Sequence, residues 1–399
     1  MRYILKNKFY MFLISVIDFL GSIIFFPFKI FRKKSPGNIG NVLVIRLDHL
    51  GDVIFSTPIP QNIKEHYKGA KITFLVGSAA KEIIMNNPYI DEVICYDAPW
   101  FSRSNRKFFA LLGFLKVAKE LRKYSYDIGF DLRGDFRHII LMAIVGVKFK
   151  VSYGITGGGF LLHKKVEYRD NVHAIEHNLD LLRSMDVKIT TEKLQLQGST
   201  RDEEFMSKYL KSNNLSEDNK LAVIHTSAGY PSKNWLNERF AKLIRILNED
   251  FGFMPVLIGS EEDKGKNDEI IHLSNIAALN AAGVTTIGTL LALIKKSTIF
   301  IGIDSGPSHI AALGGLPSII LYSGTNQPGE WAPKNNKAII IQKDIPCKGC
   351  ERLDCEHNIC MDMISVDDVV EAVRGMLEKP VEQGTGVRVQ GTEKLTPEP

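Results

Sequence analysis

The residues best suited to chemistry lie in three short segments, each at or just after the end of an apolar run. The first, residues 46–52 (RLDHLGD), ends a run that begins at Asn41. Gly51 permits an unusual turn or a close backbone approach, and Asp52 lies near an expected helix start. A carboxylate there can deprotonate a hydroxyl group. Turns and helix caps use the same residue types, so Asp52 and Asp48 also have a purely structural interpretation.

The other two segments supply groups that suit phosphate. Residues 225–235 (HTSAGYPSKNW) offer small hydroxyl side chains and Lys233, whose ammonium group can neutralise a diphosphate. An ordinary loop with a solvated lysine is the alternative. Residues 303–309 (IDSGPSH) place Pro307 in an expected first helical turn, where N–H groups and the positive helix end bind anions. His309 can hydrogen-bond that phosphate or lie buried on the helix.

Alternating strand and helix patterns position these segments. Helical stretches such as 108–123 and 237–250 separate the apolar runs. The expected strands span 41–47, 71–76, 93–96 and 127–131 in a first series and 221–225, 254–259, 298–303 and 318–322 in a second. Such alternation predicts two doubly wound sheets of an α/β protein. Ligands bind beyond the carboxyl ends of the strands in such sheets, where the three segments fall, and two halves predict a central cleft.

Residues 9–30 (FYMFLISVIDFLGSIIFFPFKI) are the most apolar stretch, with lysines and arginines on both sides and no small-residue cleavage site for a signal peptide. Their length suits a membrane span. However, Ser15, Asp18 and Ser22 form a narrow polar stripe with Lys8 and Lys29 at its ends, and a mid-segment charge is costly in hydrocarbon. We favour a helix that lies in the membrane interface; a span and a buried core helix are the alternatives.

Composition and cysteine usage narrow the class further. Hydrophobic residues make up 45% and charged residues 24%, which excludes disorder for most of the chain. The net charge of +5 fits a phosphorylated partner as well as a generic surface. Four of the five cysteines cluster as C-x2-C-x4-C-x4-C, namely Cys347, Cys350, Cys355 and Cys360. Four thiolates can hold a structural zinc; disulfides, free thiols and an iron–sulfur cluster are alternatives, and His357 is expected to be solvated.

In order and separation, the three segments resemble glycosyltransferase family 9, the ADP-heptose:lipopolysaccharide heptosyltransferase family, from about Asn41 to about Met376. Residues 131–134 (DLRG) with Arg137 resemble a family segment that follows a first-domain strand, and residues 259–262 (GSEE) resemble its nucleotide-side loop. The resemblance implies a GT-B fold, two Rossmann-like domains that face a central cleft, with an inverting transfer and ADP-heptose as donor.

The resemblance also assigns roles to individual residues. Asp52 becomes the general base, and Gly51, Arg133 and Arg137 form the acceptor side, with Arg137 facing a phosphorylated, anionic acceptor. The donor contacts are Thr226, Ser227, Lys233, Glu262, Thr285, Asp304, Ser305, Gly306 and His309. Glu261 and Asp263 are alternative positions for the contact assigned to Glu262.

The chemistry of the residues agrees with these roles. Attack on an anomeric carbon needs a deprotonated hydroxyl, which Asp52 would supply, and a stabilised leaving diphosphate, which Lys233 and the helix start at 305–309 would supply. Domain closure would bring the two together. The sequence has no evident carboxylate motif for a divalent metal, so no cofactor is expected for catalysis.

Five regions are expected. They are a membrane-associating helix (1–36), an acceptor-binding domain (37–197), a connector (198–220), a nucleotide-sugar-binding domain (221–378) and a disordered tail (379–399). The expected enzyme transfers heptose from ADP-heptose to a lipopolysaccharide core acceptor, either Kdo-lipid A or an inner-core heptose. It would work at the cytoplasmic face of the inner membrane, as a peripheral or monotopic protein, with a single span as the alternative.

Two other functions stay open. A related transferase could use another nucleotide sugar, because a phosphate cradle does not read the sugar. A membrane-tethered protein that binds nucleotide sugars without catalysis is the second, although the joint presence of Asp52, Lys233 and Asp304 argues against it. No G-x-G-x-x-G follows the first strand, which disfavours a dehydrogenase, and nucleic acid is not an expected partner.

Overall fold

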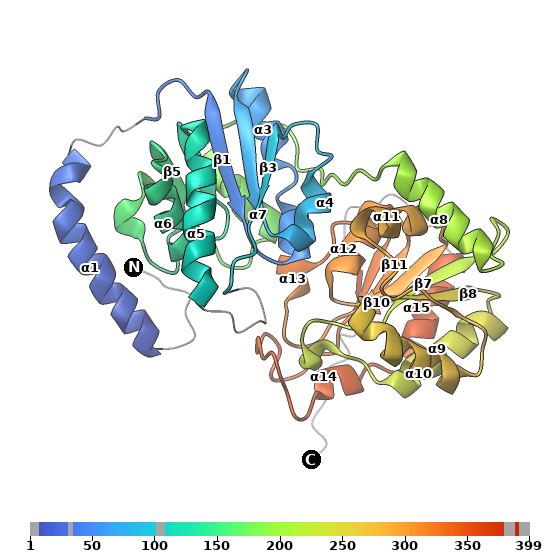
Figure 1. Cartoon of the computed structure of the whole chain (residues 1–399). Coiled ribbons are helices and arrows are strands. Elements are labelled where there is room, and N and C mark those ends of the chain that lie inside the picture. Colours follow the sequence, from blue (N-terminus) through green and yellow to red (C-terminus); the bar gives the residue numbers. More distant parts are fainter. Residues whose placement is uncertain (1–7, 31–34, 101–107, 379–387, 391–399) are drawn as a thin grey trace, which may run out of the picture. The chain divides into compact units, whose positions relative to one another are not determined.

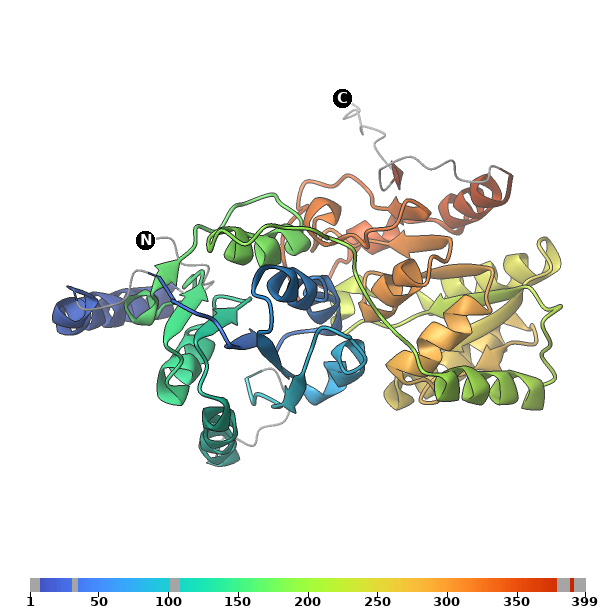
Figure 2. The same ribbon diagram turned by 90° about the horizontal axis from the view of Figure 1, so that it is seen from above.

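Two compact units make up the computed structural model, Met1–Leu196 and Gln197–Pro399. The structure describes residues 8–30, 35–100, 108–378 and 388–390 (Figure 1). Each unit contains a parallel sheet with helices on both of its faces, as Figure 2 shows from above. The α/β fold class predicted from the alternating patterns is therefore confirmed.

The first unit is built on a six-stranded sheet in the order β3-β2-β1-β4-β5-β6, with every pair parallel. Its strands are β1 (Asn41–Arg46), β2 (Lys71–Val76), β3 (Glu92–Cys95), β4 (Ile128–Asp131), β5 (Phe149–Ser152) and β6 (Lys164–Lys165). Val42, Leu43, Val44 and Ile45 are fully buried. A strand covered on both faces needs such a continuous apolar run, which is why the sequence pattern identified it.

Helices α5 and α6 cover one face of this sheet and α2, α3 and α7 the other (Figure 2). The helices are α2 (Leu50–Phe55), α3 (Ile59–His66), α4 (Lys81–Ile84), α5 (Phe108–Leu121), α6 (Phe136–Val145) and α7 (Ala174–Arg183), with 3-10 turns η1 (Ser78–Ala80), η2 (Arg122–Tyr124) and η3 (Gly159–Leu161). The sequence predicted a turn at Gly51, but Gly51 lies inside α2 and is not among the residues with positive φ. Six residues are too few to show a helical period.

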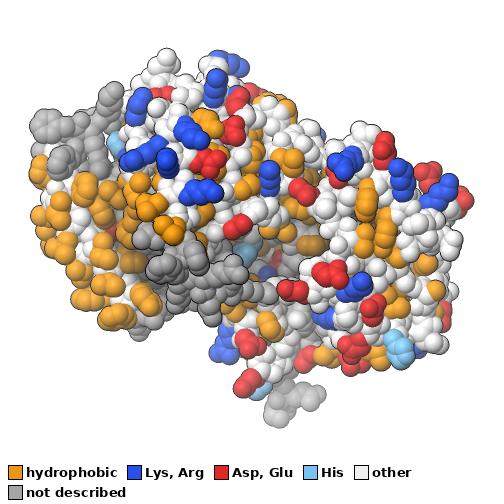
Figure 3. All heavy atoms as spheres, in the orientation of Figure 1, with side chains coloured by type: hydrophobic (Ala, Val, Ile, Leu, Met, Phe, Trp, Pro, Cys, Tyr) orange, Lys and Arg blue, Asp and Glu red, His pale blue; other side chains and the backbone are white. Residues whose placement is uncertain are grey.

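Helix α1 (Lys8–Ile30) belongs to the first unit and packs against η3. Its segment Phe9–Pro27 is long and apolar enough to cross a membrane, the one such helix in the part of the chain that the structure describes. Only 11% of this apolar segment is buried, which excludes the interpretation of α1 as a buried core helix. Hydrophobic side chains gather over α1 at the left of Figure 3.

The second unit repeats the architecture with a seven-stranded parallel sheet, ordered β13-β12-β11-β10-β7-β8-β9. Its strands are β7 (Leu221–His225), β8 (Met254–Ile258), β9 (Leu279–Asn280), β10 (Ile299–Ile303), β11 (Ser318–Leu321), β12 (Ala338–Ile341) and β13 (Arg388–Gln390). Residues 388–390, within the range 379–399 that the sequence predicted as a disordered tail, form β13 and pair with β12. The rest of that range lies outside the described residues.

Helices α9, α10 and α15 cover one face of the second sheet, and α8, α11 and α12 lie on the other (Figure 1). The helices are α8 (Thr200–Ser212), α9 (Asn237–Glu249), α10 (Lys264–Ser274), α11 (Ile287–Lys295), α12 (Gly306–Leu313), α13 (Pro328–Trp331), α14 (Ile359–Asp362) and α15 (Val366–Glu378), with η4 (Pro231–Lys233) and η5 (Glu261–Asp263). Helix α8, in the stretch expected as a connector, packs on α11 within this unit.

Candidate active site

The predicted acceptor-side residues meet where the strand order of the first sheet reverses. β1 pairs with β2 on one side and with β4 on the other, and ligands bind outside the carboxyl ends of strands at such a point. Helix α2 starts just after β1 and carries Asp52 in its first turn. After β4, Arg133 lies in the loop and Arg137 in the first turn of α6. Two loops about 85 residues apart in sequence thus share one edge.

Arg46, at the end of β1, holds both carboxylates of the first segment. Its Nη2 donates to Oδ1 of Asp52 at 2.6 Å, and its Nε lies 3.2 Å from Oδ2 of Asp48. Its Nη1 donates to the carbonyl oxygen of Leu132 at 2.7 Å, which ties β1 to the loop after β4. Arg46 and Asp48 are buried, so the pairing compensates charges that water does not reach.

The ion pairs continue to the loop after β4. Oδ1 of Asp48 lies 2.9 Å from Nη1 of Arg133, whose Nε lies 3.7 Å from Oδ2 of Asp135. Asp135 accepts two hydrogen bonds from the Arg137 guanidinium, at 2.6 and 2.8 Å, and that guanidinium lies over the Trp100 ring. The side chains of Arg133 and Arg137 are 37% and 42% exposed, so both can also meet a ligand.

The surrounding charges keep these carboxylates ionised. Burial alone would raise the pKa of Asp135, but the hydrogen bonds from Arg137 and the charges of His138 and Arg137 outweigh it and lower the value to about 2. Burial opposes the charge of Asp48 as well, and Arg46 and Arg133 nevertheless hold its pKa below the usual range.

Asp131, at the end of β4, organises this loop from inside the protein. It is fully buried and accepts hydrogen bonds from the Gly134 N–H at 3.0 Å and the Ser152 hydroxyl at 2.7 Å, and it lies 2.8 Å from Nδ1 of His138. Asp131 therefore fixes the turn that carries Arg133, while the more exposed arginines remain available to a ligand.

The predicted donor residues meet at the equivalent point of the second sheet, where β7 pairs with both β8 and β10. Thr226 and Ser227 follow β7, and Asp304 and Ser305 follow β10. The Ser305 hydroxyl lies 2.9 Å from Nδ1 of His225, which joins the two strand ends. Burial lowers the pKa of His225 to about 4, so this imidazole is neutral near pH 7.

Helix α12 points its amino end at this edge. Ser305 is its N-cap, Ser308 completes a capping box, and Pro307 lies in the first turn as predicted. The remaining N–H groups and the positive end of the helix dipole suit an anion. His309, in the same turn, is buried.

Lys233 lies beside Asp304 rather than in a solvated loop. Its Nζ is 2.6 Å from Oδ2 of Asp304, which also accepts from the Asn326 side chain at 2.7 Å. Lys266, which the sequence analysis did not single out, donates to the Thr226 carbonyl oxygen at 2.8 Å, and burial lowers its pKa. A second lysine therefore borders this edge. Its contact with Thr226 becomes visible only once α10, which carries it, is placed.

The remaining donor assignments lie further along the same edge. Thr226 is buried and its hydroxyl donates to Asn267 at 2.7 Å, so this side chain faces α10. Glu262 lies exposed in η5, after β8. The adjacent Asp263, one of the alternatives to Glu262, accepts from the Ser260 hydroxyl at 2.7 Å, and hydrogen bonds from Ser260 and Ser227 help to lower its pKa against the opposing effect of burial. Thr285 is half-buried just before the N-cap of α11.

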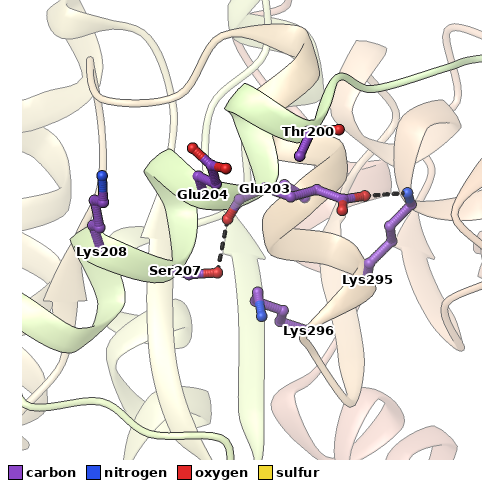
Figure 4. A pocket seen from close by; sticks show the side chains of 8 residues that line it. Thr200, Glu203, Glu204, Ser207, Lys208, Lys295 and Lys296 are labelled. Carbon is purple, nitrogen blue, oxygen red and sulfur yellow. Dashed lines mark hydrogen bonds and ion pairs between the residues drawn. The ribbon is translucent and has the colours of Figure 1, made fainter.

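One cavity of the second unit lies away from these residues. It has a volume of about 530 Å³ and is lined by residues of α8 and α11 (Figure 4), namely Thr200, Glu203, Glu204, Ser207, Lys208, Ala292, Lys295 and Lys296. The end of α11 leads directly into β10, so the cavity lies at the amino edge of the sheet. Ligands of doubly wound sheets bind at the opposite edge, and this cavity is not the site we consider.

The cysteine cluster does not form a metal site in this structure. The described residues contain no group of three or more His, Cys, Asp or Glu placed to hold a metal ion, and the four cysteines, all described, are free thiols. Cys360 is buried, and its burial raises the thiol pKa. The structure thus gives no support to structural zinc, which stays a prediction that zinc analysis of the purified protein can decide.

Comparison with known proteins agrees with this geometry. The sequence model of Glycosyltransferase family 9 (heptosyltransferase) matches residues 114–359. The chain belongs to this family. The transferase is 26% identical over 308 residues to the lipopolysaccharide core heptosyltransferase OpsX of Haemophilus influenzae, covering 75% of this chain and 84% of that protein. It is also 26% identical over 339 residues to lipopolysaccharide heptosyltransferase 3 of Escherichia coli, covering 82% and 95%.

The fold of the transferase is shared with solved structures. The E. coli ADP-heptose lipopolysaccharide heptosyltransferase II superposes with a TM-score of 0.68 at 20% identity, covering 85% of this chain and 98% of that one. This likeness confirms the GT-B class, and family membership confirms the expected glycosyltransferase.

Acidification should destabilise the transferase through His225. Its folded pKa of about 4 lies below the usual 6.5, so the unfolded chain binds a proton that the folded chain refuses, and stability falls as the pH drops from about 6.5 towards 4. We expect His225→Gln to remove about 2 kcal/mol of the loss in unfolding free energy between pH 7 and pH 5. Denaturant titrations at both pH values measure this, with the exposed His66→Gln as matched control. Equal pH dependence in all three proteins would contradict the assignment.

Proposed function

We propose that the transferase moves heptose from ADP-heptose to a lipopolysaccharide core acceptor, either Kdo-lipid A or an inner-core heptose, with inversion at the anomeric carbon. The names of the relatives support the sugar and the acceptor class, and the E. coli structure carries ADP-heptose in its name. The observation that carries the proposal is the arrangement of both sites, a carboxylate with arginines at one strand-order reversal and an anion-suited helix end at the other.

Asp52 is the proposed general base. Arg46 fixes its Oδ1, which leaves Oδ2 to accept the proton of the acceptor hydroxyl. The resulting oxygen forms a bond to the anomeric carbon as the bond from that carbon to the diphosphate oxygen breaks and ADP leaves. Arg133 and Arg137, half exposed at the same edge, would bind the anionic groups of the acceptor.

The second unit would stabilise the leaving diphosphate. The amino end of α12 offers N–H groups and a positive dipole, and Lys233, which pairs with Asp304 in this structure, adds an ammonium donor. His225 is neutral near pH 7, so its bond to Ser305 orients the hydroxyl and adds no charge. Cationic and dipolar groups thereby supply the stabilisation, and the proposal requires no cofactor.

The proposed setting is the cytoplasmic face of the inner membrane. The free cysteines suit a reducing compartment, and α1 offers an apolar surface next to the unit that carries Asp52. The partners would be ADP-heptose, the lipopolysaccharide core acceptor and the membrane surface.

Replacing the base should remove turnover while binding persists. We expect Asp52→Asn to lower kcat by about 10²- to 10⁴-fold, with KM for ADP-heptose nearly unchanged, because the amide still accepts from Arg46 but takes no proton. ADP release with truncated lipopolysaccharide acceptors measures this. Asp91→Asn, which alters an ion-paired aspartate of the same unit, is the matched control and should stay active.

Three outcomes would overturn parts of this assignment. A near-normal kcat in Asp52→Asn would show that Asp52 is not the general base. Turnover of other nucleotide sugars, with no ADP release from ADP-heptose and any acceptor, would replace the donor by another nucleotide sugar. Binding of ADP-heptose without turnover in any assay would favour a non-catalytic binding protein.

Lys233 should matter to the leaving diphosphate. We expect Lys233→Met to lower kcat/KM for ADP-heptose by about 10- to 100-fold, the range for loss of a charge-assisted hydrogen bond, and Lys233→Arg to restore part of it. Lys242→Met, an exposed lysine on α9 in the same unit, is the control. If both methionine variants retained wild-type kcat/KM, Lys233 would have only its structural bond to Asp304.

A further inference from the structure

Helix α1 turns its polar stripe towards the protein. The side chains on its covered side are spaced three or four apart, as one helical face requires, and they are Met11, Ile14, Ser15, Asp18, Gly21, Ser22 and Phe25. The stripe that the sequence predicted as the polar side of an interfacial helix is therefore the docking side. Asp18, its one acidic residue, is 1% exposed.

Asp18 is held by the loop that leads into η3. Its Oδ1 accepts from the Gly158 N–H at 2.7 Å. The Lys165 ammonium and the Asp18 carboxylate both lie within 4 Å of the position that a Cβ on Gly159 would occupy. A mid-helix carboxylate, costly in an apolar setting, thus receives a donor and a nearby cation from the protein.

Close contacts on either side of Asp18 fix the docking geometry. The Phe160 ring lies against Gly21, where a Cβ would come within 2.6 Å of a ring carbon, and Phe160 packs on Phe25 with ring centroids 5.4 Å apart. Gly157, at φ +109°, leaves room for Ile14, whose Cγ2 would meet a Cβ at 2.6 Å. Glycines on both partners therefore permit this approach, and the loop is built to receive α1.

The rest of the helix surface is apolar and open. Large hydrophobic side chains with exposed fractions from 37% to 69% cover it (Figure 3), namely Phe9, Tyr10, Phe12, Leu13, Val16, Ile17, Phe19, Leu20, Ile23, Ile24 and Phe26. A continuous apolar surface along a 23-residue helix far exceeds the isolated hydrophobic residues of an ordinary surface and marks an interaction site.

We infer that α1 is an in-plane membrane helix. It stays docked on the first unit through Asp18 and Gly21, and its apolar face lies in the surface of an anionic bilayer. Charge supports this occupant. The sequence places Lys8 and Lys29 at the ends of the helix and four more basic residues next to it in the chain, Lys6, Arg32, Lys33 and Lys34. Lys164 and Lys165 lie exposed in β6 after the docking loop. Basic residues that border an apolar face bind anionic headgroups.

The docking contacts also argue against a span. They run from Ile14 to Phe25, through the middle of the helix. A spanning α1 would hold these residues in hydrocarbon and draw in the docked loop, its backbone polar groups and the exposed lysines beside it. An in-plane helix keeps the loop and lysines at the headgroups.

The placement gives α1 a task that rests on the proposed function. The unit that carries Asp52, Arg133 and Arg137 is the one that α1 would hold at the bilayer. A lipid-linked acceptor exposes its sugars at that same surface, so lateral diffusion in two dimensions would bring acceptor to base.

Flotation of the full-length protein with vesicles tests the lipid face. We expect binding to vesicles of phosphatidylethanolamine and phosphatidylglycerol, weaker binding to pure phosphatidylcholine, and at least tenfold lower partitioning for Phe12→Glu/Phe19→Glu. The matched control, Phe205→Glu/Leu353→Glu, alters exposed hydrophobic residues of the second unit and should float as wild type does.

The docking variant separates the two faces of α1. Gly21→Leu forces the Phe160 ring away while leaving the lipid face intact, so it should still float. Undocking should speed tryptic cleavage after Lys165, which lies near Asp18 in the docked arrangement, in detergent. It should also lower activity on acceptor in vesicles several-fold more than activity on a soluble acceptor fragment. Cleavage and both activities equal to wild type would overturn the docked arrangement.

The side of the membrane on which the N-terminus lies distinguishes an in-plane helix from a membrane span. An N-terminal epitope should be open to protease in sealed inverted membrane vesicles, on the same side as the rest of the chain; a protected epitope would overturn the inference. Flotation of Phe12→Glu/Phe19→Glu equal to that of wild type would also overturn it. So would a wild-type protein that does not bind vesicles and forms a dimer that this variant dissociates. Flotation, protease access to the epitope and tryptic cleavage need no turnover, so an inactive enzyme that floats would refute only the proposed function.

Discussion

Both candidate sites depend on the reversal of strand order beside the first strand of each sheet. The strands β1 and β4, and likewise β7 and β10, pair in parallel while their following chains leave in different directions. Loops from distant parts of the sequence therefore end side by side. This constraint joins Arg46 to the loop after β4 and His225 to Ser305, and it decides which residues can act together.

Charge burial then shapes what each site can do. Arg46 and Asp304 are both nearly inaccessible, and each is held by partners of opposite charge or by hydrogen bonds. A lone buried charge would cost several kcal/mol, so these pairings are a condition for folding as much as for function. In the first unit, the more exposed Arg133 and Arg137 can bind an anionic ligand while the buried ion pairs stay intact. A buried anchor and an accessible end are thereby combined in one network.

Strands and helix starts could be predicted from local sequence patterns, whereas contacts between residues far apart in the sequence could not. Apolar runs located β1 and β10, and Pro307 marked the start of α12, because these signals are local. The bond from Arg46 to Asp52 spans six residues but depends on α2, which is too short to show a helical period. Asp135, Asn326 and Lys266 gained their roles only through side-chain contacts between separate elements. The strand β13, three residues long, has no sequence signal of its own.

The N-terminal helix shows the same limit from the other side. Its sequence correctly indicated one polar stripe, but a stripe alone does not say whether water or protein faces it. The deciding feature is a small residue on the polar face: Gly21 lies three residues after Asp18 on the same side of the helix. A glycine there allows close packing against protein, which a face turned to solvent does not need. A polar stripe that also contains a glycine at helical spacing is therefore better interpreted as a docking surface. The apolar majority of such a helix is then left for lipid, and its acidic residue no longer argues against contact with a membrane.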